Sequence, residues 1–158
     1  MENATSYPSA RTSSELLGSR LLDKGWSLAC AESCTGGLIS SACTEISGSS
    51  QWFERGFVTY SNAAKHELLG VDWALIERHG AVSEEVARAM ALGALRHSRA
   101  QVALAVTGVA GPTGGRQTSP WAQSGSLGGC RVLLGPAWAL RVRGSRQSFV
   151  TLRETAPR

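Results

Sequence analysis

The order of hydrophobic and polar positions over residues 13–108 predicts helices and strands that alternate along the chain. In the first segment, four leucines recur at the spacing of one helix face, and the helix they predict is capped by Ser13 or Ser14 and stopped by Gly25. The predicted helices are Ser13–Lys24, Leu38–Ile46, Ala63–Leu69, Trp73–Arg78 and a helix that Ser83 caps and that ends at His97. The predicted strands are Ser27–Ala31, Gly56–Tyr60 and Gln101–Thr107.

This alternation is typical of the α/β fold class and predicts a layered α/β/α domain with a mostly buried mixed sheet. The segment Gln101–Thr107 is apolar on both faces, which indicates a strand covered on two sides. Three polar or glycine-rich loops follow the strands, at Glu32–Gly37, Ser61–Lys65 and Gly108–Gly115. Since ligands of such folds gather where strands end, these loops are expected to line one cleft.

The first loop, in the sequence AESCTGG, brings two hydroxyl groups to a turn before a helix. Ser33 or Thr35 could serve as a nucleophile or as a phosphate ligand, because the amide groups of a helix N-terminus favour anions. Either hydroxyl could instead cap the helix that follows, and the pattern alone leaves both interpretations open.

The second loop, in the sequence YSNAAK, places Tyr60 five residues before Lys65. A lysine acts as a general base when burial or a neighbouring cation lowers its pKa, and a neutral lysine beside a serine forms a two-residue catalytic unit. Tyr60 could then donate to an oxyanion. The alternative is that Lys65 is an ordinary solvated lysine.

The third loop, TGVAGPTGG, allows close approach of a ligand to the backbone but lacks the spacing of a P-loop. The alternative is that it is a plain connection between elements. The three histidines, His66, His79 and His97, lie on separate predicted helices without metal-ligand spacing, and we expect them at the surface. No metal site is therefore predicted.

Charge and cysteine content restrict the class of protein further. The net charge of +4 divides into −2 for residues 1–115, with nine Lys and Arg against eleven Asp and Glu, and +6 for residues 116–158, with seven Arg against Glu154. Because the basicity is confined to one tail, it is poor evidence for nucleic-acid binding. No apolar run is long enough for a membrane span, residues 1–12 are expected to be a disordered lead-in, and the four cysteines are expected to be reduced thiols of a cytoplasmic protein.

Together, AESCTGG, GSSQWFERGFVTYSNAAKHELLGV, HGAVSEEVA and TGVAGPTGG resemble, in order and spacing, the CinA C-terminal domain family of nicotinamide-nucleotide amidohydrolases. The resemblance covers residues 13–115 and implies hydrolysis of the carboxamide of nicotinamide mononucleotide (NMN) to nicotinic acid mononucleotide and ammonia. It implies no cofactor and no metal, a small nucleotide substrate as the partner, and it is compatible with a homo-oligomer.

The resemblance also implies roles for individual residues. Lys65 would be the general base, Ser33 the first choice of nucleophile and Ser50 the second, with Tyr60 near the reacting amide. The nucleotide site would be lined by Thr35, Gly36, Gly37, Asn62, Thr107, Gly108 and Gly111.

The tail, residues 116–158, departs from the family, which continues with a Lys-Pro-Val-Gly-Thr-Val strand, further strands and a helix. Codons for Lys-Pro-Val-Gly-Thr-Val-Trp-Phe-Ala-Trp, read one base later, can encode Ser119–Gly128 as it stands here. We hypothesise that the reading frame slips near Gly114–Gly115, so that the C-terminal strands and helix are altered or missing. The alternative is a divergent tail of unknown role. Two alternatives to an active amidohydrolase follow: a non-catalytic nucleotide-binding or inactive truncated homologue, and a basic nucleic-acid-binding protein suggested only by the tail arginines.

Overall fold

The computed structural model describes residues 9–108, 129–134, 138–143 and 148–154. Its elements are α1 (Ala10–Lys24), β1 (Leu28–Glu32), α2 (Leu38–Thr44), a 3-10 helix η1 (Ser49–Gln51), β2 (Phe53–Val58), α3 (Asn62–Leu69), α4 (Trp73–His79), α5 (Glu84–Arg96), β3 (Val102–Gly108), β4 (Gly129–Leu134), β5 (Trp138–Arg143) and β6 (Ser148–Glu154). Side chains are described up to Gly108.

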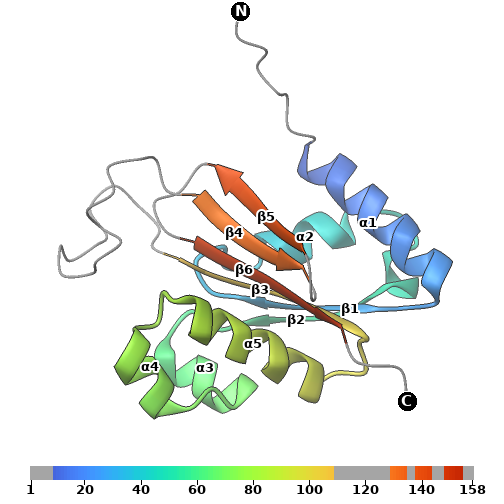
Figure 1. The fold of residues 1–158 in the computed structure, drawn as a ribbon. Helices are drawn as coiled ribbons and strands as arrows, with labels where there is room; N and C mark the ends of the chain where they lie inside the picture. Colours follow the sequence, from blue (N-terminus) through green and yellow to red (C-terminus); the bar gives the residue numbers. More distant parts are fainter. Residues whose placement is uncertain (1–8, 109–128, 135–137, 144–147, 155–158) are drawn as a thin grey trace, which may run out of the picture.

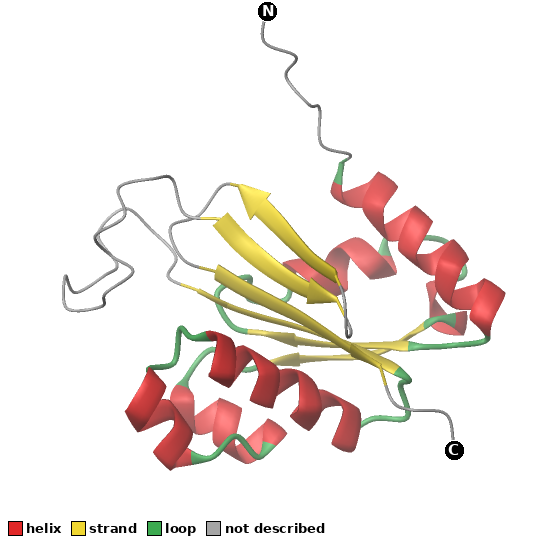
Figure 2. Cartoon of the chain, viewed as in Figure 1, coloured by secondary structure: helices red, strands yellow, loops and turns green. Residues whose placement is uncertain are grey.

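The strands form one sheet in the order β2-β1-β3-β6-β4-β5, with helices on both sides (Figure 1). β1 pairs in parallel with β2 and β3, whereas β6 runs antiparallel to β3, so the sheet is mixed. Helices α3, α4 and α5 lie on one face, and α1 and α2 lie on the other (Figure 2). The predicted α/β class with layered helices and a mixed sheet is confirmed.

Strand β1, which lies between β2 and β3, is buried along its whole length and contributes to a core on each face. Ala29 and Ala31 pack in the cluster that contains Met90 of α5. Leu28 and Cys30 point the opposite way, into the cluster that contains the buried Trp52. Because successive strand residues alternate between faces, this register also decides where the next two residues, Glu32 and Ser33, point.

The predicted elements are present, with differences at their ends. The predicted cap of the first helix at Ser13 or Ser14 is wrong: α1 begins at Ala10, and Ser9 Oγ accepts a hydrogen bond of 3.1 Å from the Thr12 amide. The buried residues of α1 are Ser14, Gly18 and Leu21, whereas Leu16 and Leu22 are exposed, so the leucine spacing showed that a helix is present but neither its buried face nor its first turn. The cap predicted at Ser83 is confirmed by a 3.2 Å bond from the Val86 amide.

The tail adds β4, β5 and β6 to the sheet, where the sequence predicted altered or missing strands. After β3, the residues that the structure describes form strands and include no helix. The proposed frame slip, Gly111 and Ser119–Gly128 lie outside the described residues. Within the described part of the chain, none of the helices is long and apolar enough to cross a membrane.

Candidate active site

The C-terminal ends of the three parallel strands meet at one edge of the sheet. Glu32, the last residue of β1, is in register with Val58 of β2 and with Val106 of β3. The residues that follow these three positions are Ser33, Thr59 and Thr107, and all three are buried. The strand ends therefore gather hydroxyl groups from three distant parts of the sequence.

Lys65 reaches this edge from the first turns of α3, the helix that follows β2. Ser61 caps α3 by accepting a 3.0 Å hydrogen bond from the Ala64 amide, which directs Lys65 back toward the strand ends. Lys65 Nζ lies 3.1 Å from Ser33 Oγ, 2.9 Å from the Thr59 carbonyl oxygen and 3.2 Å from the Tyr60 carbonyl oxygen. With 1% of its surface exposed, Lys65 is not the solvated lysine of the alternative interpretation.

The surroundings of Lys65 disfavour its charged form. Burial lowers the pKa of Lys65 below its usual value, because a buried ammonium loses its hydration. A negative charge on the nearby Cys34 thiol would act in the opposite direction, and burial outweighs it. A lysine with a lowered pKa is the kind that can accept a proton near neutral pH.

Glu32 caps α2, which answers one of the questions that the sequence left open. Its Oε2 accepts hydrogen bonds from Thr35 Oγ1 at 2.7 Å, the Gly37 amide at 3.1 Å and the Ile39 amide at 3.0 Å. Its Oε1 accepts from the Ser40 amide at 2.8 Å and from Ser40 Oγ at 2.6 Å. The idea that Ser33 or Thr35 caps this helix is therefore wrong, and the Ser33 hydroxyl is left facing Lys65.

Ser33 is held at the strand end by the main chain. Its amide donates to the Val106 carbonyl oxygen at 3.0 Å, and the Thr59 amide donates to the carbonyl oxygen of the preceding Glu32 at 2.7 Å. The side chain of Ser33 is 6% exposed and lies on the same face of the sheet as Ala29 and Ala31, two and four residues earlier. Strand alternation thus sends Ser33 toward α3 and Glu32 toward α2.

Several of the expected substrate-binding residues also lie at this edge. Gly36 and Gly37 adopt φ angles of 57° and 104°, which a residue with a Cβ atom rarely adopts. Asn62 begins α3 and is exposed. Thr107 is buried, and its hydroxyl donates to the Ala81 carbonyl oxygen at 2.8 Å, so it ties β3 to the segment before α5. Gly108 ends β3 and is half-buried.

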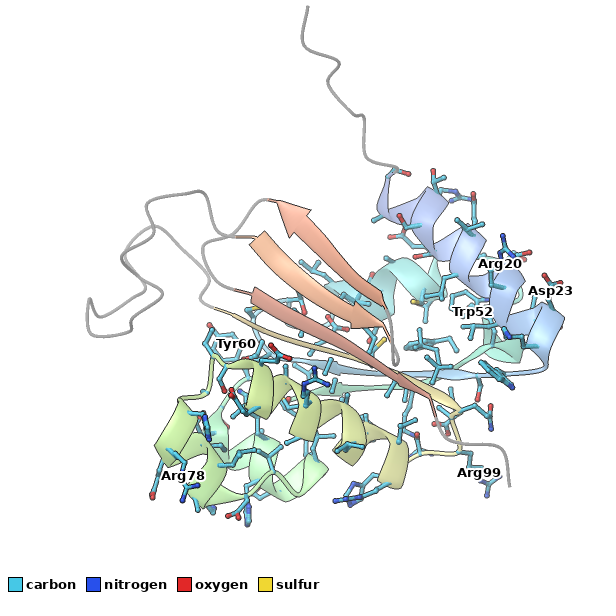
Figure 3. The ribbon with its side chains drawn as sticks, viewed as in Figure 1. Arg20, Asp23, Trp52, Tyr60, Arg78 and Arg99 are labelled. Atoms are coloured by element: carbon cyan, nitrogen blue, oxygen red, sulfur yellow. The ribbon has the colours of Figure 1, made fainter. Side chains whose placement is uncertain are left out.

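Of the two remaining candidates, Tyr60 lies beside Lys65 and Ser50 lies far from it. The Tyr60 side chain is 69% exposed, while its carbonyl oxygen accepts from Lys65. Ser50 is exposed on η1, just before Trp52, and Trp52 lies beside the first residue of β1. Figure 3 shows Trp52 and Tyr60 at opposite ends of the sheet. The structure therefore brings Ser33, Tyr60 and Lys65 together and does not bring Ser50 to them within one chain.

The histidines take no part in this site. His66 and His97 are exposed, and the Nδ1 atom of each lies 2.9 Å from a backbone carbonyl oxygen, of Val71 and of Gly93 respectively. Among the residues that the structure describes, no three His, Cys, Asp or Glu side chains are grouped so that they could hold a metal ion.

Sequence reasoning did not assign the helix cap to Glu32 and missed Thr59. A signal for Glu32 was present, because it is the one charged residue in the strand sequence LACAE, and a charge at a buried position needs partners. Thr59 contributes through its carbonyl oxygen, for which side-chain identity gives no signal.

The sequence is similar to that of known proteins. The family model of the CinA C-terminal domain matches residues 10–124. A protein of Enterobacter agglomerans named nicotinamide-nucleotide amidohydrolase PncC is 61% identical over 104 residues, which are 66% of this chain and 63% of that protein. The protein of the same name from Escherichia coli K12 is 50% identical over 107 residues, 68% of this chain and 65% of that protein.

Solved structures show the same likeness. The competence/damage inducible protein CihA of Agrobacterium tumefaciens superposes with a TM-score of 0.67 at 46% identity, over 72% of this chain and 69% of that chain. A competence-damaged protein (CinA) superfamily protein of Escherichia coli superposes with a TM-score of 0.70 at 32% identity, over 94% of this chain and 78% of that chain. The fold defines an α/β domain in which a buried serine at the end of β1 contacts a buried lysine of α3. This chain belongs to the CinA C-terminal domain family, and it spans less than two thirds of the length of the two curated relatives.

Proposed function

We propose that this chain hydrolyses the carboxamide of NMN to nicotinic acid mononucleotide and ammonia, with Ser33 as nucleophile and Lys65 as general base. The observation that carries the proposal is the 3.1 Å contact between Lys65 Nζ and Ser33 Oγ in a buried setting. The names of the relatives from Enterobacter agglomerans and Escherichia coli support the substrate and the reaction.

The three oxygen partners of Lys65 Nζ can satisfy a neutral amine as well as an ammonium. A neutral amine has two N–H bonds and one lone pair. The two N–H bonds can donate to the carbonyl oxygens of Thr59 and Tyr60, at 2.9 and 3.2 Å, since a carbonyl oxygen only accepts. The lone pair is then directed at the Ser33 hydroxyl, which can donate its proton to nitrogen.

The reaction follows from this arrangement in two halves. Lys65 takes the proton of Ser33 Oγ while Oγ attacks the amide carbon, and the resulting lysine ammonium gives a proton to the departing nitrogen. Ammonia leaves, and an ester joins Ser33 to the nicotinoyl group. Lys65 then takes a proton from water, the water oxygen attacks the ester carbon, and the proton returns to Ser33 as the carboxylic acid is released.

Tyr60 and the loop residues are proposed to receive the substrate. The side chain of Tyr60 is exposed, and the backbone carbonyl oxygen of the same residue accepts a hydrogen bond from Lys65. We propose that the Tyr60 hydroxyl donates a hydrogen bond to the developing oxyanion. The loops are proposed to line the nucleotide site through Thr35, Gly36, Gly37, Asn62, Thr107, Gly108 and Gly111. Because Glu32 occupies the first amide groups of α2, the substrate phosphate is expected to bind elsewhere on these loops.

Ammonia release from NMN tests the proposal when wild type is compared with Ser33→Ala, Lys65→Ala and Ser50→Ala. Loss of a nucleophile or general base should lower kcat by at least about 10²-fold. We expect that loss for Ser33→Ala and Lys65→Ala, with circular dichroism confirming that both remain folded. A wild-type protein that binds NMN and releases no ammonia would instead favour a non-catalytic nucleotide-binding homologue. Loss confined to Ser50→Ala would assign the nucleophile to the other serine.

A further inference from the structure

Glu32, the residue directly before Ser33, places a carboxylate in the protein core. It is fully buried, and its two carboxylate oxygens together accept five hydrogen bonds. Burial alone would raise the pKa of Glu32, but hydrogen bonds from Ser40, from Thr35 and from the amides of Ile39 and Ser40 hold it below the usual value. The carboxylate is therefore ionised at neutral pH. In this form both of its oxygens only accept, so it can receive all five hydrogen bonds.

The five donors come from the segment that follows Ser33. Thr35 and Gly37 belong to the turn directly after the serine, and Ile39 and Ser40 belong to the first turn of α2. The turn contains two glycines with positive φ. Because glycine has no Cβ atom, these two residues leave the backbone of the turn free to adopt other conformations. Without the carboxylate, the turn would keep the backbone bond from the Gly36 amide to the Ser33 carbonyl oxygen, 3.1 Å long, and lose its contacts to the strand end.

Glu32 and Lys65 lie on opposite faces of the sheet. Burial of Lys65 dominates its pKa, and Glu32 is not among the groups that shift it. Among the described residues, no ion pair joins the two side chains. We therefore expect Glu32 to act on the reaction through the turn that follows Ser33 and not through the charge of Lys65.

We propose that Glu32 is a positioning residue for amide hydrolysis, whose carboxylate fixes the turn after Ser33 and so keeps Ser33 Oγ within hydrogen-bonding distance of Lys65 Nζ. This proposal rests on the proposed function of the Ser33–Lys65 pair. It gives Thr35 a second role, because the Thr35 hydroxyl is one of the groups that the carboxylate holds.

The test compares Glu32→Gln with Ser40→Ala. A glutamine has nearly the same shape but is uncharged and presents an NH₂ group where one carboxylate oxygen accepted, so the backbone amide bonded at that oxygen loses its acceptor and the remaining hydrogen bonds lose the charge that strengthens them. A displacement of about 1 Å at a reacting group can cost about 10²-fold in rate. We expect kcat for NMN to fall by about 10- to 100-fold in Glu32→Gln, with KM within about threefold of wild type. The apparent pKa of the acid limb of kcat should stay unchanged, since Lys65 keeps its surroundings.

Ser40→Ala is the matched control for a purely structural role. It removes one hydrogen bond to the carboxylate and leaves the bonds from Thr35, Gly37 and Ile39 to the other oxygen in place, so we expect a lower melting temperature and a kcat within about twofold of wild type. Should Glu32→Gln fail to fold, Thr35→Val decides the matter. Positioning predicts a lower kcat for that variant whatever happens to KM, whereas a role only in substrate binding predicts a higher KM at unchanged kcat.

A second readout keeps this proposal separate from the choice of substrate. The rate at which a fluorophosphonate labels Ser33, followed by peptide mass spectrometry, reports the reactivity of the serine without NMN. We expect Glu32→Gln, or Thr35→Val in its place, to be labelled at least about tenfold more slowly than wild type and Ser40→Ala to match wild type, even if NMN is not the substrate. Equal labelling of all variants, absence of labelling in wild type, or equal loss of kcat in Glu32→Gln and Ser40→Ala would overturn the proposal.

Discussion

Replacement of Gly93 by alanine is expected to displace the helix that carries Lys65. Gly93 is buried in α5, and a Cβ atom built there overlaps the carbonyl oxygen of Leu69 and lies 2.7 Å from Leu69 Cβ and 2.9 Å from the Leu69 carbonyl carbon. Leu69 is the last residue of α3, one helical turn after Lys65. Because the overlapping oxygen and carbon belong to the backbone, rotation of a side chain cannot relieve the contact, and α3 must move as a unit.

The size of the effect can be estimated from two opposing contributions. Alanine favours a helix interior over glycine by about 1 kcal/mol. Overpacking of a close helix contact costs about 1–3 kcal/mol, and a backbone contact belongs at the upper end of that range. The free energy of unfolding should therefore fall by about 1–2 kcal/mol. A shift of α3 by a fraction of an ångström should also weaken the contact of Lys65 with Ser33 and lower kcat about tenfold.

Urea unfolding and ammonia release, measured on the same preparations, test this prediction. The matched control is Gly18→Ala, whose Cβ would lie 2.7 Å from the indole ring of Trp52, on the sheet face that α1 covers. The control should lose similar stability and keep its kcat, because it leaves α3 untouched. A Gly93→Ala protein with wild-type stability and wild-type kcat would refute the reasoning about this helix contact.

Four further outcomes follow from the geometry. The acid limb of kcat/KM should lie below the usual lysine pKa, because burial lowers the pKa of Lys65, and activity should rise as pH rises through it; a pH–rate profile measures this. The lowered pKa of Glu32 contributes stability that is present above its unfolded value of about 4.5 and is lost as pH falls through the folded value, so urea midpoints of Glu32→Gln should vary less with pH below about 4.5 than those of wild type. Thr107→Val should lose about 1–3 kcal/mol in urea unfolding, because the Ala81 carbonyl oxygen loses its partner, while Thr107→Ser should keep most of it. Dialysis against a chelator should leave ammonia release unchanged.

Much of this arrangement could be predicted from the sequence, because its signals are local. The alternation of helical and strand patterns gave the layered α/β fold, and the rule that sites lie at strand ends pointed to the loop residues beside Ser33 and Lys65. The N-terminal cap of α5 at Ser83 and the C-terminal end of α1 at Gly25 depend on residues that are close together in the chain. Such short-range features can be read without knowledge of tertiary contacts.

The remaining features depend on contacts between distant segments. The sequence could not decide whether Lys65 is buried, since its partners include a carbonyl oxygen of Thr59 whose position depends on strand pairing. The pattern AESCTGG offered hydroxyl groups as caps, whereas the carboxylate of Glu32 reaches the helix because β1 delivers it to that face. Ser50 was a reasonable second choice of nucleophile in the sequence. In the structure Ser50 precedes β2 and Lys65 follows it, so the two residues lie at opposite ends of this strand.

The most direct test of the Ser33–Lys65 mechanism is the mass of the protein after rapid quenching of its reaction with NMN. A nicotinoyl nucleotide ester is predicted on the peptide that contains Ser33, formed at the rate at which ammonia appears, and it should be absent in Ser33→Ala and in Lys65→Ala. Steady release of ammonia by Ser33→Ala, or an adduct located on Ser50 or Cys34, would contradict the mechanism.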